Sequence, residues 1–76
     1  MWIDGEFTID GCNFRYSAKV FEEGSQFGIN NGRISKLEIW DKDTNEVVVN
    51  YDRGWDIYPG RNLDKQALKY VLELYK

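Results

Sequence analysis

The sequence predicts an α+β fold in which an antiparallel β-meander carries one C-terminal helix on one face. Three observations support this fold class: apolar and polar residues alternate through most of the chain, turn signals separate the alternating stretches, and a helical apolar stripe follows them. The 76 residues have the length of one domain, which we place at residues 1–76. We expect four strands, or five if a short segment of the central loop also pairs.

The first two strands form the predicted N-terminal hairpin. Residues 2–9 and 12–21 each alternate with period 2, which is typical of half-buried strands. Asp10-Gly11 lies between them and favours a type I′ turn, in which both central residues need positive φ. The residues predicted to face the core are Ile3, Phe7 and Ile9, followed by Cys12, Phe14, Tyr16, Ala18 and Val20.

Residues 22–32 are predicted to form a loop, because glycine, serine and asparagine recur through them. We expect Phe27 and Ile29 to fold back onto the core. The optional fifth strand is residues 26–30, since Asn31-Gly32 could turn it onto the next strand.

A second hairpin is predicted from strands at residues 33–41 and 46–52, joined by the polar turn 41–45. The first of these strands directs Ser35, Leu37 and Ile39 inward. The face opposite the helix would then expose Ile34, Trp40 and Val48, and such apolar groups often mark interfaces, so a homodimer is one expectation.

The C-terminal helix is predicted to start at Asn62 as N-cap, with Asp64 near the positive end of the helix dipole. Its apolar residues recur at helical spacing and must pack on the inner face of the meander. They are Leu63, Ala67, Tyr70, Val71 and Leu74, widened by Leu68, Leu72 and Tyr75.

Composition excludes several kinds of chemistry. The chain has no histidine, which rules out Ser-His-Asp and Cys-His catalysis, and one cysteine, which rules out a Cys-rich zinc site or an internal disulfide. We interpret Cys12 as a small buried hydrophobe. Asp41, Asp43 and Asn45 imitate the start of a calcium loop, but Glu46 stands where that loop needs glycine, so we predict a solvated turn. No cofactor or metal is expected.

Charge and hydropathy limit the partners. Ten Lys and Arg against thirteen Asp and Glu give a net charge of −3, which disfavours binding to a nucleic-acid backbone. The N-terminus shows no basic and apolar signal region, and no apolar stretch approaches the roughly 18 residues of a membrane span. We therefore expect a cytoplasmic protein with no membrane partner.

The candidate binding site lies within the stretch from Asn50 to Gly60 and includes two basic residues that precede it in the chain. Tyr, Trp and Arg dominate binding hot spots in protein interfaces. Asp52 and Asp56 flank Arg53, but nothing places them in one pocket, so no catalytic residue is predicted. The candidate binding residues are Arg33, Lys36, Tyr51, Asp52, Arg53, Trp55 and Asp56.

Two alternatives stand beside this site. In the structural alternative, Arg53 pairs with one or both neighbouring aspartates, Gly54 lets the chain bend, and the aromatic residues anchor the junction between sheet and helix. In the nucleic-acid alternative, exposed rings stack on single-stranded bases while basic side chains meet phosphates. The residues for that role are Trp40, Trp55, Tyr58, Arg33, Lys36, Arg53 and Arg61.

Three strings resemble a family of short uncharacterised proteins from bacteria and their phages: Gly32 to Leu37, Asn50 to Asp56 with Pro59, and Lys19 to Ser25. The resemblance covers almost the whole chain and implies a small cytoplasmic protein, often encoded by a phage or mobile element. It implies no activity. Small phage proteins often act by binding a host protein, and by this analogy we expect a non-enzymatic protein-interaction module that modulates a host or defence protein.

Overall fold

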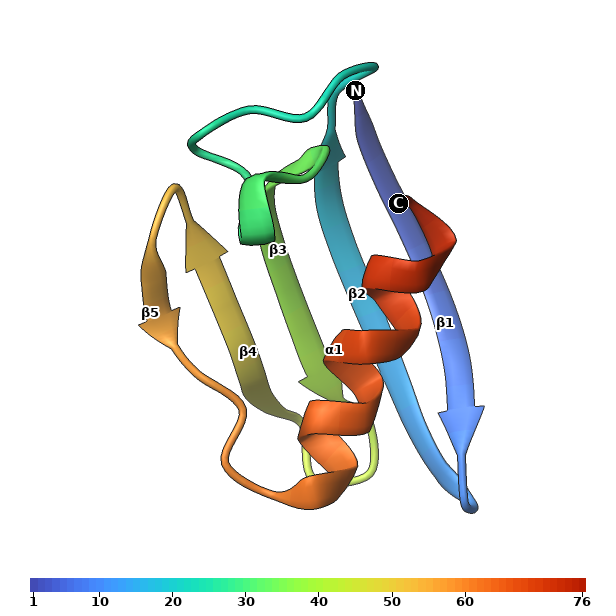
Figure 1. The fold of residues 1–76 in the computed structure, drawn as a ribbon. Coiled ribbons are helices and arrows are strands. Elements are labelled where there is room, and N and C mark those ends of the chain that lie inside the picture. The colour runs from blue at the N-terminus through green and yellow to red at the C-terminus, as the bar shows by residue number, and fades with distance from the viewer.

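A computed structural model describes residues 1–76 as a five-stranded antiparallel sheet with one helix on one face (Figure 1). The strands lie in chain order, β1-β2-β3-β4-β5, so the predicted meander and α+β class are confirmed. No helix is long and apolar enough to cross a membrane. The elements are β1 (Trp2–Ile9), β2 (Cys12–Val20), the 3₁₀ turn η1 (Ile29–Asn31), β3 (Ile34–Asp41), β4 (Glu46–Asp52), β5 (Trp55–Ile57) and α1 (Asn62–Leu74).

The fifth strand is β5 and not the predicted segment 26–30. Asn30 and Asn31 both have positive φ, 53° and 58°, which a regular strand does not permit, so this segment forms η1 instead. Ile29 is buried as predicted. Phe27 is not, because its side chain remains 52% exposed beside the β4–β5 turn.

The N-terminal hairpin agrees with the prediction in register and turn. β1 pairs with β2 from Trp2 opposite Lys19 to Ile9 opposite Cys12, with no irregularity. Asp10 and Gly11 have φ of 49° and 79°, the two positive values that a type I′ turn requires.

Two β-bulges change which residues of the second hairpin face the core. Between β2 and β3 the register shifts by one residue, and Ile34 turns inward to only 2% exposure. Between β3 and β4 a second shift leaves Val48 as the extra residue, packed against the core. The predicted outward positions of Ile34 and Val48 are therefore wrong, and only Trp40 remains on the face away from the helix.

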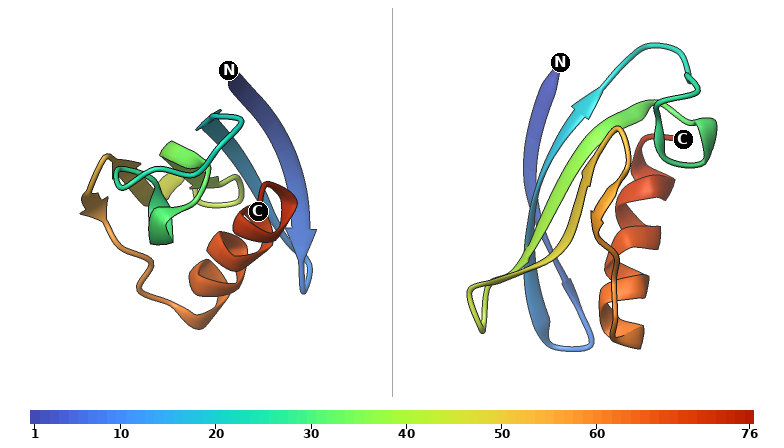
Figure 2. Two further views of the ribbon diagram at one scale, coloured as in Figure 1. Left: turned by 45° about the horizontal axis from the view of Figure 1, so that its top comes forward. Right: turned by 90° about the vertical axis from the view of Figure 1, so that its left-hand side faces the viewer.

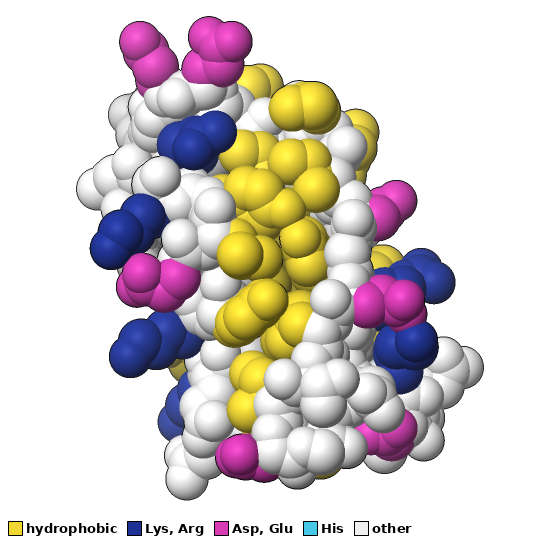
Figure 3. Space-filling view, turned by 90° about the vertical axis from the view of Figure 1, so that its right-hand side faces the viewer, with side chains coloured by type: hydrophobic (Ala, Val, Ile, Leu, Met, Phe, Trp, Pro, Cys, Tyr) yellow, Lys and Arg dark blue, Asp and Glu magenta, His cyan; other side chains and the backbone are white.

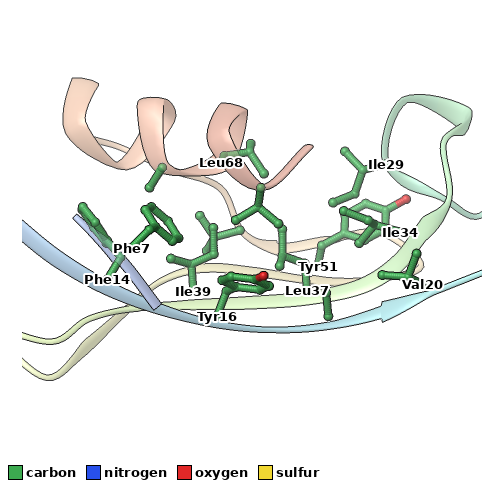
Figure 4. Packing of buried hydrophobic residues seen from close by; sticks show 14 residues of the cluster. Phe7, Phe14, Tyr16, Val20, Ile29, Ile34, Leu37, Ile39, Tyr51 and Leu68 are labelled. Carbon is green, nitrogen blue, oxygen red and sulfur yellow. The ribbon is translucent and has the colours of Figure 1, made fainter. Parts of the chain in front are cut away.

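Helix α1 lies across the inner face of the curved sheet (Figure 2). Fourteen buried side chains of the sheet, η1 and the helix make one core (Figure 4). From the helix, Ala67, Leu68 and Val71 enter this core, whereas Tyr70 and Leu74 of the predicted stripe stay partly exposed.

Aromatic contacts join the helix to the first hairpin. Tyr70 stacks on Phe7 with ring centroids 4.4 Å apart, and the hydroxyls of Tyr16 and Tyr75 lie 2.7 Å apart. Burial, together with this hydrogen bond, raises the pKa of Tyr16 to about 12. The tyrosine pair therefore holds the C-terminal end of α1 against β2 as long as Tyr16 is neutral.

The N-terminal end of α1 is fixed by an ionic network. The N-cap is Arg61, one residue before the predicted Asn62, and its guanidinium Nη2 donates to Asp41 at 2.8 Å and to Asp64 at 2.7 Å. Both carboxylates are buried, and the backbone N–H groups of Asp43 and Thr44 also donate to Asp41. The hydrogen bond from Arg61 holds the pKa of Asp41 below its usual range.

Candidate binding site

The turn between β4 and β5 bends at Arg53 and not, as predicted, at Gly54. Arg53 has a φ of 59°, in the left-handed region that disfavours residues with a side chain, whereas the φ of Gly54 is not positive. Two backbone hydrogen bonds hold this conformation: Arg53 N–H donates to Ser35 O at 3.1 Å, and Asp52 N–H donates to Gly54 O at 2.9 Å. The surrounding backbone thus fixes Arg53 in a strained conformation at the tip of the turn.

An exposed aromatic surface follows from this turn. Trp55 packs edge-to-face between Tyr51 and Tyr58, with ring centroids 5.0 Å and 4.8 Å away. Tyr51 is buried, and its hydroxyl donates to the backbone O of Phe27 at 2.9 Å. We call Phe27, Arg53, Trp55 and Tyr58 the aromatic cluster.

The four residues of the aromatic cluster all reach solvent. Trp55 is 40% exposed and Tyr58 is 62% exposed. The guanidinium carbon of Arg53 lies 6.0 Å from the centroid of the Phe27 ring, within cation–π range. No carboxylate lies within 4.0 Å of the Arg53 guanidinium, so the predicted pairing with Asp52 or Asp56 is wrong.

The other predicted site residues lie elsewhere. Lys36 and Asp52 pair at 3.6 Å on the face opposite the helix, beside a shallow hollow of about 320 Å³ that Trp40 also lines. Asp56 is exposed on β5. Arg33 lies at the base of the central loop, where its Nε donates to Phe21 O at 2.8 Å. Of the seven predicted residues, the structure thus brings together Tyr51, Arg53 and Trp55.

Two members of the aromatic cluster were missed by the site prediction. The sequence predicts Phe27 in the core and favours Tyr58 only for the nucleic-acid alternative. Tyr58 had a usable signal, because a residue before proline is restricted to extended conformations, and the fully buried Pro59 anchors it here. Phe27 had none, since its position depends on a hydrogen bond to a residue 24 positions away.

The aromatic cluster presents groups that can pack and form hydrogen bonds. Its side chains offer flat apolar rings and one cation, and they contain no carboxylate, thiol or amine that could act as nucleophile or base. Nowhere in the chain do three His, Cys, Asp or Glu side chains converge in a way that could hold a metal ion.

A second apolar surface lies at the opposite side of the molecule. Hydrophobic side chains form a continuous band between α1 and β1 (Figure 3). The Phe7–Tyr70 contact crosses between these two elements, and the Tyr16–Tyr75 contact joins the end of α1 to β2 beside them. The edge of β1 beside this band carries no partner strand.

Comparison with known proteins gives one result. No curated protein and no solved structure matches the chain. The family model of a domain of unknown function matches residues 1–76. The chain therefore belongs to the family of the domain of unknown function DUF7678.

Proposed function

We propose that the protein is a non-enzymatic protein-interaction module whose partner binds at the aromatic cluster. The observation that carries this proposal is Trp55, an exposed tryptophan fixed between two tyrosines beside an unpaired arginine. Tyr, Trp and Arg are the residues that contribute most to protein interfaces. The turn and the loop it touches also gather four of the nine large exposed hydrophobic residues of the chain: Phe27, Trp55, Ile57 and Tyr58.

Preorganisation supports the same proposal. Trp55 rests on the buried Tyr51, and Tyr58 is followed by the buried Pro59, so ordering these rings on binding costs little entropy. The charge of Arg53 has no internal partner and can pair with a carboxylate of the bound protein.

The biological setting is part of the proposal. The resemblance to short bacterial and phage proteins supports a cytoplasmic protein, encoded by a phage or mobile element, that modulates a host or defence protein. The resemblance depends on sequence strings at residues 32–37 and 50–56. The second string contains the β4–β5 turn, where the aromatic cluster lies.

Capture from bacterial lysate tests the proposal, with the tagged full chain used with and without nuclease. Arg53→Gly removes the guanidinium and suits a φ of 59°, so its free energy of unfolding should stay within about 1 kcal/mol of wild type. We expect the wild type to capture a nuclease-resistant protein in stoichiometric amount, and Arg53→Gly and Trp55→Ala to lose it.

Trp2→Ala is the matched control for Trp55→Ala, because Trp2 is also an exposed tryptophan but lies on the N-terminal edge strand. It should capture the partner like wild type. Thermal melts of each variant separate loss of binding from loss of folding. Equal capture by wild type and a folded Trp55→Ala variant, or no stoichiometric protein at all, would refute the proposal.

Single-stranded nucleic acid is the second candidate. Three exposed rings beside Arg53 could stack on successive bases, while the net charge of −3 opposes phosphate binding. Gel-shift titrations with RNA and DNA oligonucleotides at two salt concentrations decide this point. The absence of a shift at low salt would exclude this candidate.

A further inference from the structure

We infer that a groove next to the aromatic cluster binds an acidic peptide segment of the partner, with one large apolar side chain seated between carboxylates. This inference rests on the proposed function and specifies the chemistry of the partner. The groove lies between η1 and the C-terminal half of α1 and encloses about 420 Å³, within the range of ligand sites. The right view of Figure 2 shows η1 standing beside this end of the helix.

The floor of the groove is apolar and fixed. It is formed by Ile29, Ile34, Leu68 and Leu72, of which the first three are buried. The wall at η1 is rigid, because Gly28 packs so closely on Gly32 that a side chain at position 28 would collide with the carbonyl O of Gly32. The groove is therefore preformed and can receive a large apolar side chain without rearrangement.

The charge of the groove is opposite to that of the chain. Its lining includes four cationic residues and one acidic residue, which leaves six cations and twelve acids for the rest of the molecule. The acid, Glu73, is already paired with Lys76 at 3.3 Å. No carboxylate lies within 4.0 Å of the other three cations, Arg33, Lys65 and Lys69.

The positions of these cations specify where the acidic groups of the peptide lie. Lys65 and Lys69 are one helical turn apart on the same face of α1, so their side chains are neighbours along one wall. Arg33 comes from the other side, at the base of the loop. Carboxylates on both sides of an apolar side chain would therefore meet cations on both walls.

Tyr58 connects the groove to the aromatic cluster. It lines the groove and also packs against Trp55. One extended peptide can thus contact both surfaces. The groove is open to solvent along one side. This favours a peptide, because its backbone can remain hydrated on the open side, whereas a lipid chain would expose apolar surface to water there.

The test uses the full ¹⁵N-labelled chain and three probe peptides, observed by amide chemical shifts. The probe is acetyl-Glu-Glu-Leu-Phe-Glu-Glu-amide, with one control in which Lys replaces Glu and another in which Ser replaces Leu and Phe. We expect saturable chemical-shift changes at the amides of Ile29, Leu68 and Leu72 when the probe peptide is added. Both control peptides should bind at least about tenfold more weakly.

Two double variants locate the site. Lys65→Glu with Lys69→Glu should weaken probe binding at least about tenfold. Arg15→Glu with Lys19→Glu makes the same charge change at two residues of β2 outside the groove, neither of which forms an ion pair, and should leave probe binding unchanged. Equal shifts with the Lys peptide, no shifts at millimolar probe, or stronger shifts at the groove with a single-stranded oligonucleotide would each overturn the inference.

The probe experiment is independent of the natural partner. Probe binding without any captured partner would support the groove inference and refute the proposed function. Capture of a partner without probe binding would refute the groove inference and leave the proposed function standing.

Discussion

Gly5 shows how a single residue constrains the first hairpin. It occupies an inward position of β1, and the ring of Tyr16 lies where its side chain would be, since an added Cβ would come within 2.5 Å of that ring. Tyr16 cannot move aside without losing its hydrogen bond to Tyr75 and its contact with Phe7. The glycine thus makes room for the contact between the hairpin and the end of the helix.

Gly5→Ala should lower the free energy of unfolding by about 1–3 kcal/mol, because the new methyl group overpacks a filled site. In a domain of this size each kcal/mol lowers Tm by about 4–8 °C, which a thermal melt detects. Gly60→Ala is the control, since position 60 has open space and no positive φ. Equal Tm values for the two variants would contradict this account of Gly5.

At the scale of elements, the sequence predicted what depends on local pattern and missed what depends on pairing. Period-2 alternation predicts β1, β2 and β3 nearly to their ends, because each is long enough to show the pattern, and the β-branched run at residues 47–49 predicts β4. β5 has three residues, too few for any period. The two bulges depend on how neighbouring strands pair, so the sequence of a single strand does not predict them. The N-cap is Arg61 and not Asn62. The local sequence could not predict this, because the partner of Arg61, Asp41, lies 20 residues earlier in the chain.

The Arg61 network makes stability depend on pH. Because the folded pKa of Asp41 is lowered, its contribution to stability is complete above a pH of about 4, where the unfolded carboxyl is ionised, and is lost as pH falls through the folded pKa. Asp41→Asn should be less stable than wild type at pH 7 and should lose less stability on acidification. Thermal melts from pH 7 to pH 2 measure both effects.

Asp56→Asn is the control for the Asp41 variant, because Asp56 is exposed and has no ion-pair partner. Its Tm should follow the wild-type values through the whole pH range. If the Tm of Asp41→Asn also changes with pH in parallel with the Tm of wild type, the ionic network does not stabilise the helix end as described.

At the scale of the whole molecule, one helix covers a sheet of five strands, and apolar surface remains at two places. One is the aromatic cluster and the other is the band between α1 and β1. Self-association through Ile34, Trp40 and Val48 loses its basis, because two of these residues face the core. Pairing of two β1 edges about Gly5 would bring Asp4 of one copy opposite Glu6 of the other, so repulsion opposes it.

Sedimentation equilibrium at low salt should therefore give a species of 9.0 kDa. Asp4→Asn combined with Glu6→Gln removes the repulsion and should shift the equilibrium toward a dimer at high concentration. Asp56→Asn with Glu73→Gln makes the same charge change away from β1 and should remain monomeric. A wild-type dimer at low salt would refute this account of the β1 edge.

The order of the strands also determines how the chain can fold while it is being synthesised. Each strand pairs with the strand made just before it, so a nascent chain can extend its sheet hairpin by hairpin without waiting for a distant partner. The contacts of the helix with the first hairpin, such as Tyr75 with Tyr16 across 59 positions, close over the longest separations. Until α1 leaves the ribosome, the apolar face of the sheet is uncovered, and that interval is when the growing chain is most open to aggregation or to capture by a chaperone.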